Sequence, residues 1–336
     1  MLDLIALPKT ELHLHLEGAV PATTLLQLIH KYGDRSAVPD LAALEMKLKH
    51  QNVDEFMAVY VWAVSYLREY EDFTLAARGI VNDLHAQGVW YAEISFSPGM
   101  FDRIGLELQP LAKAIRAGLA DSTDVKTNLL VDLIRDRGPQ QGDRRLSQTA
   151  EVAKETGIVG IGIGGSEIEF PPEPFAPVFR RAADLGLHRV AHAGEWVGPE
   201  SVWGAIRALG VERIGHGTRS FEDPALVKYL CKARLPLEVC LTSNVCTGTV
   251  TNVRDHLMLK YFEAGIPITL SSDDPTLFHT TIVDEYNHAR ASLGISDANL
   301  IKIARTGFVI AFLDESERLR FLTNFDTEVD KLKERT

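Results

Sequence analysis

Residues 8–18 read PKTELHLHLEG, and this stretch decides how the rest of the chain is interpreted. Polar residues in it alternate with leucines at Leu12, Leu14 and Leu16. Such alternation indicates an extended strand with one apolar face. His13 and His15 are two residues apart, so an extended backbone places both imidazoles on the opposite face. The pair by itself is weak evidence, because H-x-H pairs also arise by chance, but the leucines can pack against surrounding helices and favour a functional interpretation.

Short apolar runs rich in β-branched residues continue along the chain and alternate with longer segments of helical periodicity. The eight expected strands are Glu11–Glu17, Val89–Phe96, Lys126–Ile134, Ile158–Gly164, His188–Ala193, Arg213–Gly217, Leu237–Thr242 and Ile266–Ser271. Eight strands alternating with helices predict a parallel α/β sheet closed into a (β/α)8 TIM barrel. An open doubly wound sheet is the competing fold. The first strand is followed by HLHLEGAVP, however, and not by the G-x-G-x-x-G turn of a dinucleotide site.

Helical periodicity occurs both between the expected strands and in segments that a simple barrel does not need. We expect helices at Pro224–Ala233 and Val253–Ala264, between later strands. Residues 20–78 hold more helix than one crossover requires, which predicts helical insertions after the first strand. The tail from Ser296 also reads as helical and should pack outside the barrel. No linker or repeat divides the chain, so we expect one domain over residues 1–336.

Composition limits the partners and the compartment. The formal charge of −11 argues against nucleic-acid binding, which needs clustered Lys and Arg. The three cysteines form no C-x-x-C pair and suit a reduced compartment. The first residues lack the features of a secretory signal, and no apolar run is long enough to span a membrane. We therefore expect a cytoplasmic protein with no membrane or nucleic-acid partner.

Polar residues gather where several expected strands end. The fifth strand ends in HAGE, with His192 and Glu195, and the sixth ends in GHG, with His216. The eighth ends in SSDDP, with Asp273 and Asp274. Each cluster alone has a structural explanation, because a lone histidine is usually hydrogen bonded in the core or at the surface, and Asp-Asp-Pro often opens a helix. Together they lie at the carboxyl ends of barrel strands, where barrel active sites form.

Three imidazoles and a carboxylate from these clusters would make a ligand set suited to Zn²⁺. Zinc with an open coordination position lowers the pKa of its bound water to about 7. Glu195, three residues beyond His192, is then available to carry a proton, because a carboxyl group near an apolar pocket can act as an acid at neutral pH.

These residues, in this order, resemble the adenosine deaminase family within the metal-dependent amidohydrolases. The stretches that carry the resemblance are LPKTELHLHLEGAV, YAEISFSP, HAGE, RIGHGTRSFEDPALV, LEVCLTSN and SSDDPTLF. They extend from the amino terminus to about Tyr286 and so cover most of the chain. Taken together, they are far more specific than any one motif.

The resemblance implies one zinc ion per chain, with the ligands His13, His15, His192 and Asp273. It implies that Glu195 protonates the purine nitrogen beside the amino-bearing carbon and that His216 orients or deprotonates the attacking water. Asp274 would bond the imidazole-ring nitrogen of the base. Gly165 matches the glycine whose backbone N–H approaches the pyrimidine ring, and Glu17 matches the acidic position at the ribose end.

The sequence departs from the family around the fourth strand. Vertebrate-like members carry a pattern like D-L-A-G-D-E, whereas GIGIGGSE places Gly162 and Ser166 at the two Asp positions. The stretches SEIEFPPEPF and HAGEWVGPESVWGAI also read more like bacterial branches that act on modified adenosines. The leading expectation is a deaminase that converts an adenosine-type 6-aminopurine nucleoside to its inosine-type product and ammonia. The alternatives are a 6-aminodeoxyfutalosine deaminase on a menaquinone route and an adenine deaminase.

Two further interpretations of the sequence are a two-metal amidohydrolase and a non-catalytic relative. A two-metal amidohydrolase usually carries a carboxylated Lys or a Glu at the end of the fourth strand, where this chain has Gly164 and Gly165. A non-catalytic relative would be expected to have lost a ligand or the acid, and all are present. The cytidine-deaminase type is excluded because P-C-x-x-C is absent. Some aromatic residues could line a pocket, although their spacing is more simply explained by a core: Phe56, Trp62, Tyr66 and Phe96.

Overall fold

Eight parallel strands form the centre of the structure, a computed structural model that describes residues 1–334. Their bounds are β1 Lys9–His15, β2 Val89–Phe96, β3 Lys126–Ile134, β4 Ile158–Gly164, β5 His188–Ala193, β6 Arg213–His216, β7 Leu237–Val239 and β8 Ile268–Leu270. The spatial order of the strands follows the sequence, from β1 to β8. The barrel predicted from the sequence is confirmed.

The barrel closes at a seam between β8 and β1. Leu14 and Asp273 form a parallel bridge across it. The Asp273 amide donates to the His13 carbonyl at 3.0 Å, and the His15 amide donates to the Asp273 carbonyl at 3.0 Å. Closure of the sheet therefore places Asp273, which follows the last strand, beside His13 and His15 of the first strand.

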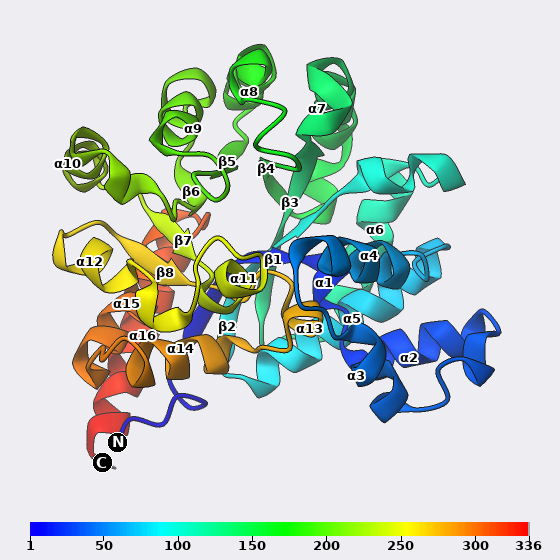
Figure 1. Cartoon of the computed structure of the whole chain (residues 1–336), viewed down its shortest axis with the longest axis horizontal. Helices are drawn as coiled ribbons and strands as arrows, with labels where there is room; N and C mark the ends of the chain where they lie inside the picture. Colours follow the sequence, from blue (N-terminus) through cyan, green and yellow to red (C-terminus); the bar gives the residue numbers. More distant parts are fainter. Residues whose placement is uncertain (335–336) are drawn as a thin grey trace.

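Helices surround the strands (Figure 1). Those between β1 and β2 are α1 Leu16–Ala19, α2 Ala22–Lys31, α3 Leu41–Leu48, α4 Val53–Val64 and α5 Tyr70–Ala86, which confirms the expected helical insertion. Those between later strands and after β8 are α6 Leu108–Leu119, α7 Gly138–Thr156, α8 Ala176–Asp184, α9 Pro199–Gly204, α10 Pro224–Ala233, α11 Leu241–Cys246, α12 Met258–Glu263, α13 Pro275–Phe278 and α14 Ile282–Ala291. No helix among the described residues combines the length and the hydropathy that crossing a bilayer requires.

The carboxyl-terminal segment forms α15 Asp297–Ile310 and α16 Glu315–Glu334, which lie outside the barrel as predicted. The helix α15 packs closely on β1, because a Cβ at Gly307 would lie only 1.9 Å from Thr10 Oγ1. The connection between the two helices covers the amino-terminal end of the barrel. There the Phe312 amide donates to Glu93 Oε1 at 2.6 Å, and the Phe312 ring lies 3.7 Å from the guanidinium of Arg213.

Some element boundaries differ from the prediction for local reasons. The first strand ends at His15, so Glu17 lies in the short helix α1 and not in the strand. Strand β7 is short because α11 begins at Leu241, whose amide donates to the buried carboxylate of Glu285 at 2.8 Å. The helix expected at Val253–Ala264 is interrupted, and only Met258–Glu263 is α-helical after a 3₁₀ turn. The helix at Pro224–Ala233 has the predicted bounds.

Candidate metal centre and active site

Four side chains meet at the carboxyl ends of the strands, and their ligand atoms all lie within 4.8 Å of one another: His13, His15, His192 and Asp273. His192 Nε2 is 3.1 Å from His13 Nε2 and 3.2 Å from His15 Nε2. Asp273 Oδ1 is 3.5 and 3.3 Å from the same two histidine nitrogens. A tetrahedral zinc site with metal–ligand bonds of about 2.0–2.1 Å has ligand–ligand edges of about 3.3–3.4 Å. The observed spacing therefore fits one ion of this size.

The pKa values of the three histidines suit the binding of a cation. Burial lowers the pKa of His15 to about 4 and that of His192 well below its ordinary value, so both rings are neutral, as metal ligation requires. Burial also acts to lower the pKa of His13, but hydrogen bonds to Asp273 and Glu238 raise it. Asp273 and Glu238 therefore stabilise a positive charge at this position.

Hydrogen bonds orient the ligands. The Nδ1 atom of His13 lies 2.9 Å from Glu238 Oε2, and that of His192 lies 3.2 Å from the Ile163 carbonyl oxygen. Each acceptor favours the tautomer with the ring proton on Nδ1. The lone pair is then on Nε2, which faces the other ligands. Outer partners of this kind are what metal-binding histidines ordinarily have.

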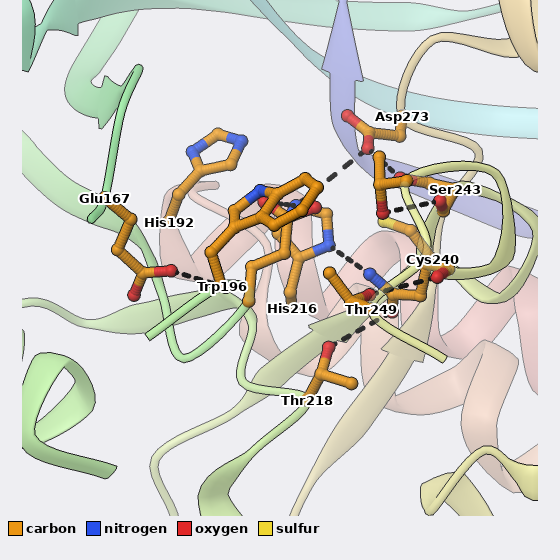
Figure 2. Close-up of polar contacts among 12 residues, drawn as sticks. Glu167, His192, Trp196, His216, Thr218, Cys240, Ser243, Thr249 and Asp273 are labelled. Carbon is orange, nitrogen blue, oxygen red and sulfur yellow. Dashed lines mark hydrogen bonds and ion pairs between the residues drawn. The ribbon is translucent and has the colours of Figure 1, made fainter. Parts of the chain in front are cut away.

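Backbone strain is concentrated at two residues of the site. Asp273 has φ 65° and His216 has φ 63°, in the left-handed region that residues other than glycine rarely adopt. Such conformations cost about 1–3 kcal/mol each and persist where the surroundings impose them. Figure 2 shows the Ser243 hydroxyl turned toward the Asp273 carboxylate, to which it donates at 2.6 Å. The structure thus holds Asp273 in one strained orientation that faces the histidines.

A buried ion network supports His13 from inside the barrel. Glu238 accepts from Arg213 Nε at 2.6 Å, and Arg213 also pairs with Glu93. Burial alone would raise the pKa of Glu238, but Arg213 and His13 lower it below its ordinary value. Sequence reasoning missed this network, although each of its members is a charged residue within a strand expected to be buried.

Glu195 is buried beside the ligand cluster, and its Oε2 lies 3.7 Å from His216 Nε2. Burial, and then the negative charges of Asp273 and Glu167, raise the pKa of Glu195 to about 8. The group is therefore mostly protonated at pH 7 and can act as a general acid.

A chain of hydrogen bonds assigns the ring proton of His216. The Met258 amide donates to His256 Nδ1 at 3.0 Å, so the proton of His256 is on Nε2 and faces Asn244 Oδ1 at 3.1 Å. The amide nitrogen of Asn244 is thereby turned to His216 Nδ1, at 3.2 Å, which must accept. Burial lowers the pKa of His216 to about 3, so the ring is neutral and carries its proton on Nε2, 3.9 Å from Asp273 Oδ2. Asn244 belongs to the stretch LEVCLTSN, but nothing in the sequence singled it out.

The three residues expected to bind the base and the ribose differ in their position relative to the cavity. Asp274 lines the cavity, its Oδ1 has no hydrogen-bond partner among the described residues, and burial raises its pKa well above the ordinary value. Gly165 also lines the cavity, with φ 96° and space for a Cβ blocked by Asp136 Oδ2 at 2.1 Å. Glu17 does not line the cavity, but it accepts at 2.8 Å from the amide of Ser97, which does.

Asp132 lines the cavity and was missed by the sequence reasoning. It is paired in register with Gly162, and a Cβ on Gly162 would lie 2.7 Å from Asp132 Oδ1. A Cβ on Gly164 would lie 2.8 Å from Asp132 Oδ2. The carboxyl group that the family pattern places at position 162 is thus replaced, in nearly the same space, by one from the neighbouring strand. Burial raises the pKa of Asp132 to about 7.

The site opens into a cavity of about 810 Å³. One end holds the ligand cluster, and the remainder has largely apolar walls from the helical insertion and the strand-end loops, including Val53, Phe56, Met57, Tyr60, Met100, Ile134, Ile168, Trp196 and Phe278. Of the four aromatic residues considered as pocket residues, Phe56 lines the cavity. Phe96 and Tyr66 are buried in the core, and Trp62 packs on Tyr66 with ring centroids 5.4 Å apart.

A second group of potential ligands, His216, Cys240 and Asp273, shares its carboxylate with the first. Burial raises the pKa of Cys240 well above the ordinary value, so its thiol stays protonated. Metal binding would have to deprotonate this buried thiol, a cost that the neutral imidazoles of the first group do not carry. The cluster of three histidines and Asp273 is accordingly the better metal site.

Comparison with known proteins gives a consistent assignment. The family model described as adenosine deaminase matches residues 8–328. An adenine deaminase of Streptomyces coelicolor is 36% identical over 320 residues, which covers 94% of this chain and 94% of the relative. An aminodeoxyfutalosine deaminase of the same organism is 34% identical over 326 residues, covering 96% and 84% respectively. The crystal structure of an adenine deaminase from Arthrobacter aurescens superimposes with a TM-score of 0.89 at 29% identity, covering 96% of this chain and 99% of that one. The chain therefore belongs to the adenosine deaminase family, and it is a hydrolytic deaminase.

Proposed function

We propose that this protein is a zinc-dependent deaminase of a 6-aminopurine nucleoside, releasing ammonia and an inosine-type product. The observation that carries the proposal is the tetrahedral spacing of His13, His15, His192 and Asp273 next to a buried, protonated carboxyl group, Glu195. These four residues would hold the zinc ion, which would lower the pKa of a bound water so that hydroxide is available at neutral pH. One ion per chain is expected, because the second ligand group shares Asp273.

The chain's own residues divide the remaining work. Glu195 donates its proton to the ring nitrogen beside the amino-bearing carbon, which makes that carbon more electrophilic. Asp274, kept protonated by burial, donates to the unprotonated nitrogen of the imidazole ring. The Nε2–H of His216 orients the attacking water, and this tautomer favours orientation over deprotonation. The hydroxyl of the water forms the new C–O bond, the C–N bond breaks, and the remaining proton of the water goes to the amino group, which leaves as ammonia.

The size of the cavity supports a purine substrate larger than the bare base. A volume of about 810 Å³ lies in the range of pockets that hold drug-sized ligands. Relatives named for adenine and for aminodeoxyfutalosine share a third or more of their residues with this chain. Both names denote 6-aminopurines, so the reacting group is common to them and the substituent on the base differs.

An ammonia-release assay with adenosine, deoxyadenosine, adenine, AMP and 6-aminodeoxyfutalosine at matched concentrations tests the proposal, together with metal analysis of the purified protein. We expect release from a nucleoside substrate and close to one zinc per chain. Release from none of the five compounds would contradict the proposed function, and close to two metal equivalents per chain would contradict the single-metal site.

Replacing Asn244 with Asp is expected to lower kcat about 10- to 100-fold while zinc content stays the same. The carboxylate can only accept, so it draws the His216 proton to Nδ1 and leaves a lone pair on Nε2, where the water needs a donor. The matched control is Asn252→Asp, the same change at an exposed residue that caps the 3₁₀ turn after α11. An Asn244→Asp enzyme as active as this control would contradict the assigned tautomer.

A further inference from the structure

Glu195, the proposed acid, lies in a segment without regular secondary structure. Strand β5 ends at Ala193 and α9 begins at Pro199, so neither element includes residues 194–198. A general acid works only when it lies within hydrogen-bond distance of the atom that it protonates. Side chains from outside this segment are therefore needed to fix the position of Glu195.

The carboxylate of Glu167 contacts the segment on both sides of the acid. Glu167 comes from the loop after β4 and is 5% exposed. Its Oε1 accepts from the Gly194 amide at 2.5 Å, and its Oε2 accepts from the amides of Trp196 at 2.7 Å and Val197 at 3.1 Å. A dashed line in Figure 2 joins Glu167 to Trp196. Since these amides precede and follow Glu195 in the chain, one buried carboxylate fastens the turn that carries the acid.

Two arginines hold backbone carbonyl groups before and after the acid. Arg135 Nη2 donates to the His192 carbonyl at 2.8 Å, and Arg219 Nη1 donates to the Trp196 carbonyl at 3.0 Å. These bonds do not involve Glu167, so they remain when that side chain is changed. We therefore expect a change at Glu167 to shift the segment locally and to leave the fold intact.

We propose that Glu167 is a positioning residue of the deaminase, which aims the carboxyl group of Glu195 at the ring nitrogen of the substrate. This inference rests on the proposed function, because it takes Glu195 as the acid. Glu167 lines the cavity, but both of its oxygens accept from backbone amides, so it acts through Glu195 and not on the substrate. Its negative charge is also a cause of the raised pKa of Glu195, after burial and the charge of Asp273.

Replacing Glu167 with Gln tests this role on whichever of the five compounds named above the wild type deaminates fastest. Glutamine keeps the shape of the side chain but turns an NH₂ group toward at least one of the amides, so two donors face each other. We expect kcat to fall about 10- to 100-fold, with KM and zinc content close to wild type, because misplacing a catalytic group by about 1 Å can cost a hundredfold in rate. Glu169→Gln, an exposed change in the same loop and outside the cavity lining, is the matched control.

A double variant separates positioning of the acid from a general structural effect. In the Glu195→Gln background, where the acid is already lost, adding Glu167→Gln should lower kcat little further, because residues that act as a unit have non-additive effects. The same 10- to 100-fold loss in both backgrounds would overturn the inference, and so would a Glu167→Gln enzyme as active as Glu169→Gln. A Glu167→Gln variant that fails to fold or loses its zinc would show a structural role only, which also overturns it. Failure of the proposed function is a different result, since the wild type would then deaminate none of the five compounds.

Discussion

The Glu195→Gln variant is expected to keep its metal and to lose about a hundred- to ten-thousandfold in kcat. Glutamine has nearly the same shape and is not among the proposed ligands, so the cluster at His192 should remain intact. Its amide cannot donate the proton that the ring nitrogen needs. Steady-state ammonia release and metal analysis of the same preparation measure the two effects separately.

The proton of Glu195 should also make the rate of the wild-type enzyme depend on pH. A group that must be protonated to act is functional below its pKa, so the rate should fall as pH rises through about 8, the raised pKa of Glu195. The Glu195→Gln variant should lack this descending limb. Glu200→Gln, an exposed change in the neighbouring helix, is the matched control. Near-normal activity in Glu195→Gln would remove Glu195 from the role of acid.

Removing the Asp273 carboxylate is expected to weaken metal retention as well as the rate. Losing a ligand should cost more affinity than the roughly 10- to 100-fold that losing an outer partner costs. Ser243→Ala removes such an outer partner, the hydroxyl that donates to Asp273, and provides the comparison. Zinc content after dialysis against a graded chelator measures both variants.

Two variants at position 273 separate ligation from backbone strain. Alanine at φ 65° is disfavoured, so Asp273→Ala can also lose stability. Asparagine tolerates this region better and keeps the shape of the side chain, so Asp273→Asn should fold normally and still retain less zinc. Full zinc content in both variants would refute Asp273 as a ligand.

The strand pattern and the polar residues at strand ends could be predicted because both are local. Alternation within β1 places His13 and His15 on one face, and the barrel topology places strand-end residues such as His192 and Asp273 at one end of the sheet. Element boundaries were less predictable where side chains from elsewhere decide them. The Glu285 carboxylate accepts from the amide of Leu241, the first residue of α11. The turn at His256 interrupts an expected helix and places the His256 ring in hydrogen-bond contact with Asn244.

The sequence by itself determined the barrel, the set of candidate ligands and the acid, because these depend on periodicity and on short motifs. Only the tertiary structure decided the orientation and the protonation states of those groups. Glu238 of β7 and Arg213 of β6 form the network that orients His13, and Asp132 fills the space beside Gly162. These relations depend on side chains brought together by sheet register and barrel closure. Protonation states follow from burial, which no pattern within a single strand can specify.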